Sequence, residues 1–444
     1  MLNTRKILFP LQNVSAKDAV GMIGAAIKGL LMGTNGTKLR TRFEKEFENL
    51  LGEGTAVAFP SGRSALAALL IANGVKPGNE VLVTGFTCDA VTQAVVATGA
   101  IPRWVDIDVD TFAMNPVLAE ESINDSPQAI IVQHSYGIPA QLEKFHEIAT
   151  RHSLALIEDN CLALGSQYAN GNVIGTGQHD AFWSFEVTKT ISAGWGGIAM
   201  VKNPNRFSTV QALRDRAGSR SRIDGVRALI QTAITALSYR PRFSGWTAYL
   251  PAVMYKIGLF SYSDKRIGGM TSQTPFESYG AAGPDDTWKL LSRQLNQLPD
   301  QIRRLKSNNN IYFETMESIG IELPESWTAE TTVLLRIPIL VKNREAFEAH
   351  MWNNNIDTGR WFDSPVTVEN TANTFGYIPG TCPVGEGIAR SITNLPTHAG
   401  MNQNYVESSA RAMGEYFANN PGESTHMNDL LASDRSKSAP QKIQ

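Results

Sequence analysis

The sequence predicts an α/β fold with a mostly parallel central β-sheet flanked by helices, followed by a smaller α+β domain. Two features of the chain lead to this prediction. From about residue 54, short runs of apolar residues alternate with helical stretches, and strands that are apolar throughout are typical of a parallel sheet covered on both faces. From about residue 287, longer helical segments, the first of them at 288–311, surround one apolar run at 332–341, which indicates a separate α+β unit.

The segment before the sheet, residues 15–50, is predicted to be helical. Gly33-Thr34-Asn35-Gly36 interrupts the pattern, and residues 39–51 resume it with Phe43 and Phe47 on one face. Because glycine and asparagine favour turns, we expect two helices here.

The strands and helices of the sheet region follow from the same alternation. The predicted strands are 56–59, 80–83, 101–105, 129–132, 154–157 and 180–189. The predicted helices are 64–72, 90–97 and 142–151. Ligands of open parallel sheets bind beyond the carboxyl ends of the strands, so the residues at and after these ends are the candidates for a site.

The length of 444 residues is enough for two domains. We place the N-terminal segment and the large α/β domain at 1–285 and the small α+β domain at 286–420. The tail at 421–444 is rich in Ser, Lys, Asp and Gln and is predicted to be disordered.

Charge and cysteine content exclude several classes of protein. A formal net charge of −2 gives no electrostatic reason to expect nucleic acid as a partner. The three cysteines, Cys88, Cys161 and Cys382, are too widely spaced for a disulfide framework or a zinc site. Residues 1–13 lack the continuous apolar core of a signal peptide, so we expect a cytoplasmic protein without a bound metal.

The stretch at about 205–285 breaks the alternation of strands and helices. It begins with an arginine cluster and contains apolar runs at 228–237 and 246–255, both too short to span a bilayer. One interpretation is an extra helical layer or a subunit interface. The other is a helix with basic flanks, within 226–262, that makes a peripheral contact with a membrane.

Lys189 and Asp159 are the candidate catalytic residues. Lys189 ends the run 180–189 before a glycine-rich turn at 194–197, and Asp159 closes the preceding strand. A lysine can form a Schiff base with pyridoxal phosphate, and a carboxylate can keep the pyridinium nitrogen of that cofactor protonated. Taken alone, however, Lys189 also fits a surface lysine and Asp159 a carboxylate that caps a turn.

An anion-binding turn accompanies these two residues. Ser61-Gly62-Arg63-Ser64 follows a predicted strand and opens a helix, where backbone N–H groups and serine hydroxyls favour an anion. Ordinary helix capping would produce the same residues. A lysine, an aspartate and an anion cradle together indicate pyridoxal phosphate.

The motifs occur in the order and spacing of a known family. They lie at 61–66, 78–81, 105–108, 134–137, 157–159, 184–185 with Lys189, and 395–400. In these motifs the chain resembles the DegT/DnrJ/EryC1/StrS group of pyridoxal-phosphate aminotransferases, which have the fold type I architecture. The resemblance covers about 15–420, apart from the unusual stretch at 205–285.

The resemblance implies a role for each candidate residue. Lys189 is similar to the Schiff-base lysine and Asp159 to the partner of the ring nitrogen, while Ser184 resembles a phosphate ligand. The phosphate-binding turn would comprise Gly62, Arg63 and Ser64. A related dehydratase branch has histidine in place of the lysine, so Lys189 favours transamination.

Several positions depart from the pattern of the family. Arg63 replaces a common threonine and can pair with the phosphate directly, and Cys88 stands where an aromatic residue usually stacks on the cofactor. Leu162, Leu164 and Trp195 replace glutamine, histidine and an acidic residue. The asparagine that a neighbouring subunit usually lends to the phosphate has no assigned counterpart.

The resemblance implies a homodimeric aminotransferase that moves an amino group from an amino acid, expected to be glutamate, to a keto sugar. A nucleotide-linked sugar of surface-polysaccharide or secondary-metabolite biosynthesis is the expected substrate. One alternative is a non-sugar or lipid-linked ketone, which the more apolar pocket and the apolar insert favour. The other is a non-catalytic regulatory relative, against which the presence of Lys189 argues.

Overall fold

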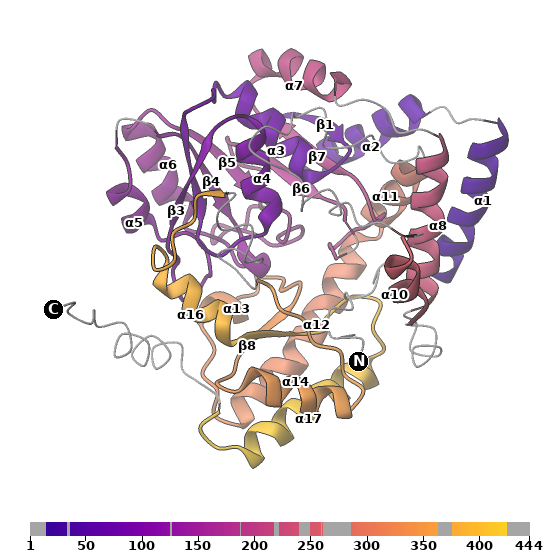
Figure 1. The fold of residues 1–444 in the computed structure, drawn as a ribbon, viewed down its shortest axis with the longest axis vertical. Coiled ribbons are helices and arrows are strands. Elements are labelled where there is room, and N and C mark those ends of the chain that lie inside the picture. Colours follow the sequence, from indigo (N-terminus) through magenta and orange to yellow (C-terminus); the bar gives the residue numbers. More distant parts are fainter. Residues whose placement is uncertain are drawn as a thin grey trace.

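A computed structural model describes residues 15–32, 36–124, 127–186, 188–216, 222–238, 249–258, 260, 286–362 and 375–423. A seven-stranded sheet of order β1-β7-β6-β5-β4-β2-β3 forms its centre (Figure 1). The strands are β1 (Thr55–Phe59), β2 (Glu80–Thr84), β3 (Ile101–Val105), β4 (Pro127–Gln133), β5 (Ala155–Asp159), β6 (Asp180–Ser184) and β7 (Gly197–Val201). Neighbouring strands are parallel except where β7 pairs with β1 and β6, so the predicted mostly parallel sheet is confirmed.

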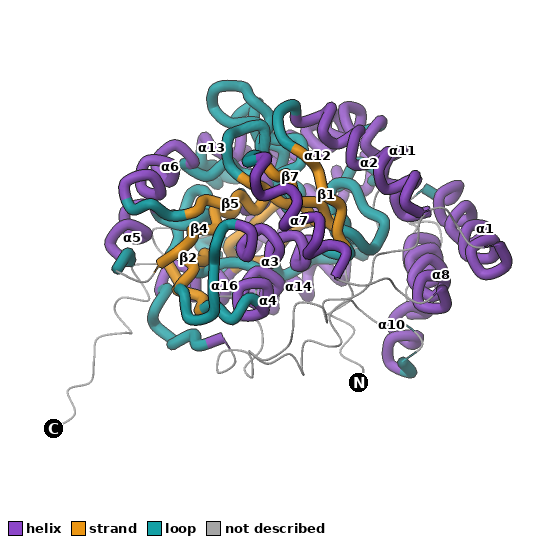
Figure 2. The backbone as a smooth tube through the Cα atoms, turned by 90° about the horizontal axis from the view of Figure 1, so that it is seen from above, coloured by secondary structure: helices purple, strands orange, loops and turns teal. Residues whose placement is uncertain are grey.

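Helices cover both faces of the sheet (Figure 2). Alternate residues of a strand point to opposite faces, so Val57 and Phe59 of β1 pack against one set of helices and Ala56 and Ala58 against another. The first set is α3 (Gly62–Ala72), α4 (Asp89–Ala97) and α7 (Pro204–Arg216). The opposite face carries α5 (Pro116–Glu121) and α6 (Leu142–Arg151) at one end, and α2 (Gly36–Leu51) and α11 (Asp286–Asn296) at the other.

A further helical layer lies outside α2 and α11. It consists of α1 (Ala16–Met32), α8 (Arg222–Ser238) and α10 (Tyr249–Lys256), which group together at one side of the molecule (Figure 1). Leu229 and Ala233 of α8 join Ala19 and Met22 of α1 in one hydrophobic cluster. None of the helices in the described ranges is long and apolar enough to cross a membrane.

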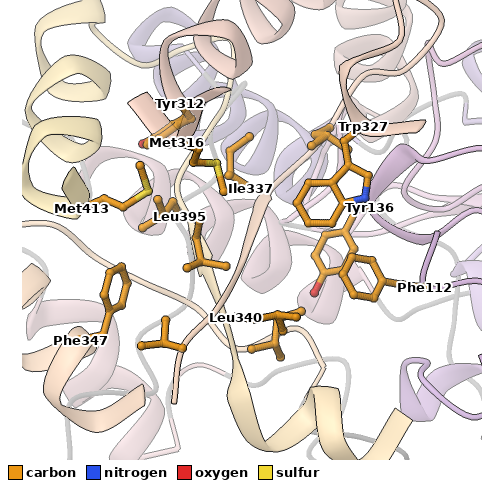
Figure 3. Close-up of a cluster of buried hydrophobic side chains, with 14 of the residues drawn as sticks. Phe112, Tyr136, Tyr312, Met316, Trp327, Ile337, Leu340, Phe347, Leu395 and Met413 are labelled. Atoms are coloured by element: carbon orange, nitrogen blue, oxygen red, sulfur yellow. The ribbon is translucent and has the colours of Figure 1, made fainter. Parts of the chain in front are cut away.

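The C-terminal unit is built around two antiparallel strands, β8 (Ile337–Leu340) and β9 (Ile392–Leu395). Its helices are α12 (Leu298–Ser318), α13 (Glu325–Thr328), α14 (Arg344–Asn353), α16 (Pro383–Ser391) and α17 (Gln403–Asn419). Figure 3 shows its core, with strand residues Ile337, Leu340 and Leu395 among Tyr312, Met316, Phe347 and Met413 of the helices. Phe112 and Tyr136, which follow β3 and β4, belong to the same core, so the unit packs against the edge of the large sheet where those strands end.

Two predicted elements end differently in the structure. The strand predicted at 180–189 ends at Ser184, and Lys189 lies in the following turn. The helical segment at 288–311 is divided between α11 and α12 at Gln297, because Pro299 lacks an N–H and fits only the first turn of a helix. The tail predicted to be disordered lies outside the described residues from 424 onward.

Candidate active site

The candidate residues meet at one edge of the sheet. β1, β2, β5 and β6 run in the same direction, so their carboxyl ends lie together, and ligands bind beyond such ends. Asp159 is the last residue of β5 and Ser184 the last residue of β6. Gly62 opens the helix after β1, Cys88 follows β2, and Lys189 lies in the turn after β6.

The turn after β1 forms an anion cradle against β6. The Ser61 hydroxyl oxygen accepts a hydrogen bond from the Ser64 N–H at 3.1 Å, and the two hydroxyl oxygens are 2.7 Å apart. A Cβ atom built on Gly62 would lie 2.9 Å from the Cβ atom of Ser184, so only glycine allows the helix to approach this closely. The N-terminus of α3 and the Ser184 hydroxyl therefore line the same spot, and Arg63 lies half-buried in the first helical turn.

Asp159 is a buried carboxylate on which the positive charge of Lys189 acts. Its side chain is 4% exposed, and its Oδ1 atom accepts a hydrogen bond from the Cys161 N–H at 3.0 Å. Burial raises the pKa of Asp159, against the lowering effect of the Cys161 hydrogen bonds and of the positive charge on Lys189. A protonated ring nitrogen beside this carboxylate would add a positive charge that favours its ionised form.

The turn that carries Lys189 is held by hydrogen bonds on several sides. The Lys189 N–H donates to the Glu186 carbonyl at 3.1 Å, and the Glu186 carboxylate accepts from the Thr188 hydroxyl at 2.8 Å. Gln294 of α11 bonds both backbone groups of Ser192, at 2.9 Å and 2.7 Å. These contacts fix the turn from which the Lys189 side chain projects.

The unusual helix α8 also supports this turn. Gly194 has a φ of +77°, a conformation that suits glycine, and a Cβ atom built on it would lie 2.4 Å from the Thr232 hydroxyl oxygen of α8. The helix thus packs against the glycine-rich segment that follows Lys189.

Two residues of the C-terminal unit also lie near Lys189. The Lys189 Nζ atom lies 5.2 Å from the centre of the Trp361 ring, and the Arg336 Cζ atom lies 5.1 Å from the same centre. Neither residue was among the predicted site residues, because both lie outside the motifs. The sequence nevertheless contains one indication that Arg336 has a special role, because it is the single charged residue within the apolar run 332–341.

Cys88 and Cys161 lie at this site as thiols. Cys88 caps α4 without a side-chain capping hydrogen bond and is exposed. Burial, followed by the charge of Asp159, raises the pKa of Cys161 well above its ordinary value, and Cys88 raises it further. Cys161 is therefore a neutral neighbour of Asp159.

Leu162 and Leu164, which depart from the family pattern, belong to hydrophobic clusters. Leu162 packs with Phe86 and Tyr136, and Leu164 packs in the cluster that contains Trp183. Both leucines are therefore part of the core.

His134 has partners at both ring nitrogens. Its Nδ1 atom accepts a hydrogen bond from the Ala140 N–H at 3.0 Å, and its Nε2 atom lies 3.4 Å from the Glu158 carboxylate. These contacts assign it a structural role. Among the described residues, no group of three His, Cys, Asp or Glu side chains could hold a metal ion.

Comparison with known proteins agrees with the geometry. Residues 18–239 and 289–414 match the model of the DegT/DnrJ/EryC1/StrS aminotransferase family, and the gap between these segments overlaps the second half of the unusual stretch. The erythromycin biosynthesis sensory transduction protein EryC1 of Saccharopolyspora erythraea is 26% identical over 356 residues, which are 80% of this chain and 83% of the relative.

A second relative and a solved structure are also similar. The dTDP-3-amino-3,4,6-trideoxy-alpha-D-glucose transaminase of Streptomyces venezuelae is 34% identical over 199 residues, 42% of this chain and 52% of the relative. The crystal structure of S. venezuelae DesV in complex with a ketimine intermediate matches the fold with a TM-score of 0.69 and 23% identity, covering 90% of this chain and 97% of DesV. With more than half of its residues matched by the family model, this chain belongs to the DegT/DnrJ/EryC1/StrS aminotransferase family.

Proposed function

We propose that this protein is a pyridoxal-phosphate-dependent aminotransferase that moves an amino group from glutamate to a keto sugar, expected to be nucleotide-linked. The observation that carries the proposal is the meeting of Lys189, Asp159 and the Gly62–Ser184 contact at one sheet edge of a chain in this family. The S. venezuelae transaminase, named for an amino sugar carried on dTDP, supports a nucleotide sugar as substrate. A role in surface-polysaccharide or secondary-metabolite biosynthesis, in the cytoplasm, is the corresponding cellular proposal.

Each residue would have a distinct task. When bound, the cofactor supplies an electron sink for the substrate carbon that loses a proton. The α3 N-terminus, with Ser64 and Ser184, would hold its phosphate, and the Asp159 carboxylate would hold a proton on its ring nitrogen. The Lys189 Nζ atom would hold the cofactor covalently and then, once freed, move the proton at the substrate carbon.

Adding glutamate to the purified, cofactor-loaded protein tests this function. The visible absorbance band of the covalently held cofactor should fade as glutamate donates its amino group, and a keto sugar should restore it. A protein that binds the cofactor but responds to no amino acid would instead be a non-catalytic regulatory relative. The name of EryC1, a sensory transduction protein, is the reason to test for this class. Recovery of the band with a lipid-linked or non-sugar ketone alone would favour the other alternative.

Replacing Gly62 with alanine should weaken cofactor binding. The new methyl group would lie 2.9 Å from the Ser184 Cβ atom and 3.3 Å from its Cα atom, so α3 or β6 must shift. We expect overpacking of about 1–3 kcal/mol and at least a tenfold weaker affinity for pyridoxal phosphate (~1.4 kcal/mol), measured by absorbance titration.

Gly24→Ala is the matched control, because a Cβ atom at Gly24 meets nothing within 4 Å. An unchanged cofactor affinity in Gly62→Ala would show that the cradle is elsewhere.

We also propose that the helices α8 and α10, in the unusual stretch at 205–285, make a peripheral contact with anionic membrane. Leu250 and Val253 of α10 and Ile257, directly after it, are 43%, 49% and 61% exposed and follow one another at helical spacing. Lys256 and Arg227 are exposed on the same helical layer, which complements anionic lipid. We propose as well that the protein is a homodimer. A monomer mass in sedimentation velocity would contradict this state.

Vesicles of phosphatidylserine and phosphatidylcholine test the membrane contact. We expect the protein to sediment with them, and the double substitution Val253→Asp and Ile257→Asp to release it, because charge on the apolar face opposes insertion. Val117→Asp, at a 63% exposed valine on α5, is the control and should leave binding unchanged. Purely soluble behaviour of the unaltered protein would reject the contact, and a change of oligomeric mass in the double variant would assign the face to a second copy.

A further inference from the structure

Trp361 is an aromatic residue of the C-terminal unit that lies beside the candidate catalytic lysine. The Lys189 Nζ atom is 5.2 Å from the centre of the Trp361 ring. An ammonium group within about 6 Å of an aromatic ring centre is attracted to the face of the ring, and tryptophan attracts a cation more strongly than the other aromatic side chains. The contact therefore joins the lysine to a segment that is distant in the sequence.

The Trp361 ring is anchored independently of Lys189. The Trp361 N–H donates to the side-chain oxygen of Asn394, a residue of β9, at 2.6 Å. The Phe362 ring lies 5.9 Å from the Trp361 ring and is nearly parallel to it, and it meets the Phe86 ring edge-on at 5.4 Å. Phe86 is fully buried in the segment after β2. The indole is thus held by both β9 and the edge of the large sheet.

The Lys189 side chain has a flexible stem, so its amine is not fixed by the turn alone. The Lys189 N–H donates to the Glu186 carbonyl at 3.1 Å, which holds the backbone but leaves the stem free to rotate. The charge of Asp159 also acts on Lys189, but within the described ranges these two groups form no ion pair. The indole face is therefore a contact that can hold the ammonium group in one place.

We propose that Trp361 is a positioning residue that stabilises the ammonium form of Lys189 and thereby assists proton transfer at the substrate carbon. The proposal rests on the aminotransferase function proposed above. In that chemistry the lone pair of the free Lys189 amine takes the proton, while the electron pair of the broken C–H bond stays on the substrate side. A positive charge then develops on Nζ, and a ring that is already in place attracts it without reorganisation.

A double-mutant cycle on the cofactor-free full chain measures the contact apart from catalysis. Lys189→Met, Trp361→Leu and the double variant are unfolded in urea, and the unfolding equilibrium constants should show a coupling of about fivefold. The Arg336 Cζ atom also lies 5.1 Å from the Trp361 ring centre, but the loss of that contact is common to both Trp361→Leu proteins and cancels in the cycle. Additivity within about twofold would overturn the proposal.

Two further cycles support this measurement. Trp352, which is 50% exposed on α14, supplies the control, and Trp352→Leu should be additive with Lys189→Met. Trp361→Phe keeps an aromatic face and should show a smaller coupling with Lys189→Met than Trp361→Leu does. It also provides a variant to measure if Trp361→Leu does not fold.

Single-turnover reaction with glutamate then relates the contact to proton transfer. Trp361→Leu should slow the reaction by about fivefold and increase the kinetic isotope effect with glutamate deuterated at the reacting carbon, because proton transfer becomes slower relative to the other steps. Trp361→Phe should restore part of the rate, and Trp352→Leu should react like the unaltered protein. A slower reaction without coupling in the cycle would assign Trp361 to substrate contact and overturn the proposal. Coupling in a protein that reacts with no amino acid would support the contact and contradict the aminotransferase function.

Discussion

Replacing Lys189 with alanine is expected to abolish transamination and covalent retention of the cofactor. The substitution removes the amine that, in the proposed chemistry, both holds the cofactor and moves the proton. General acid–base catalysis alone raises a reaction rate by about 10²–10⁴-fold. Single-turnover reaction with glutamate and the borohydride-sensitive absorbance band measure the two losses. Because Lys189 is half-buried, the free energy of unfolding should change by no more than about 1 kcal/mol.

Lys289→Ala provides the matched control, since Lys289 is an exposed lysine on α11. It should keep the band and the rate of the unaltered protein. A Lys189→Ala protein that also keeps both would remove Lys189 from the proposed chemistry.

Replacing Asp159 with asparagine is expected to slow the glutamate reaction by about 10²–10³-fold, the usual loss when one preorganised electrostatic contact is removed. The amide keeps the shape of the carboxylate but cannot hold a proton on the ring nitrogen. Stopped-flow absorbance gives the rate. Asp106→Asn is the control, because Asp106 is also a buried carboxylate but accepts hydrogen bonds from Val384 and Gly385, at 2.8 Å and 2.9 Å, away from Lys189. A rate within threefold of the unaltered protein (~0.7 kcal/mol) would contradict the role of Asp159.

Asp159→Asn, which should slow the reaction, is not expected to lower the stability of the cofactor-free protein at neutral pH. Burial raises the folded-state pKa of Asp159 above its unfolded value, so its stabilising contribution is present at low pH and is lost as the pH rises through the folded pKa. An asparagine side chain cannot ionise, so Asp159→Asn should remove this pH dependence and leave the neutral-pH stability equal or higher. Thermal unfolding of the two cofactor-free proteins across pH would show it.

The sequence could predict the large sheet and most of the candidate site because both depend on local order along the chain. Apolar runs mark the strands, and the ends of parallel strands must share an edge. Asp159 and Ser184 are the last residues of β5 and β6, and Gly62 is the first residue of the helix after β1. The topology of the sheet therefore brings the three residues together. The Gly62–Ser184 contact shows how closely that topology brings them together.

The remaining features depend on packing between distant segments. Trp361 and Arg336 reach Lys189 only because the C-terminal unit packs against the sheet edge through Phe112 and Tyr136. The sequence predicted a strand as far as Lys189, whereas β6 ends at Ser184. The turn after Ser184 is held by hydrogen-bonding groups that the apolar pattern of a strand does not indicate. One of these is the Gly196 carbonyl, which accepts from the Phe185 N–H at 2.9 Å.

Identifying the lysine that carries the cofactor tests the central proposal most directly. The protein loaded with pyridoxal phosphate is reduced with borohydride, digested and analysed by mass spectrometry. The proposed function predicts a reduced pyridoxyl phosphate group on the peptide that contains Lys189. A group on another lysine, or bound cofactor that leaves no lysine modified, would contradict it.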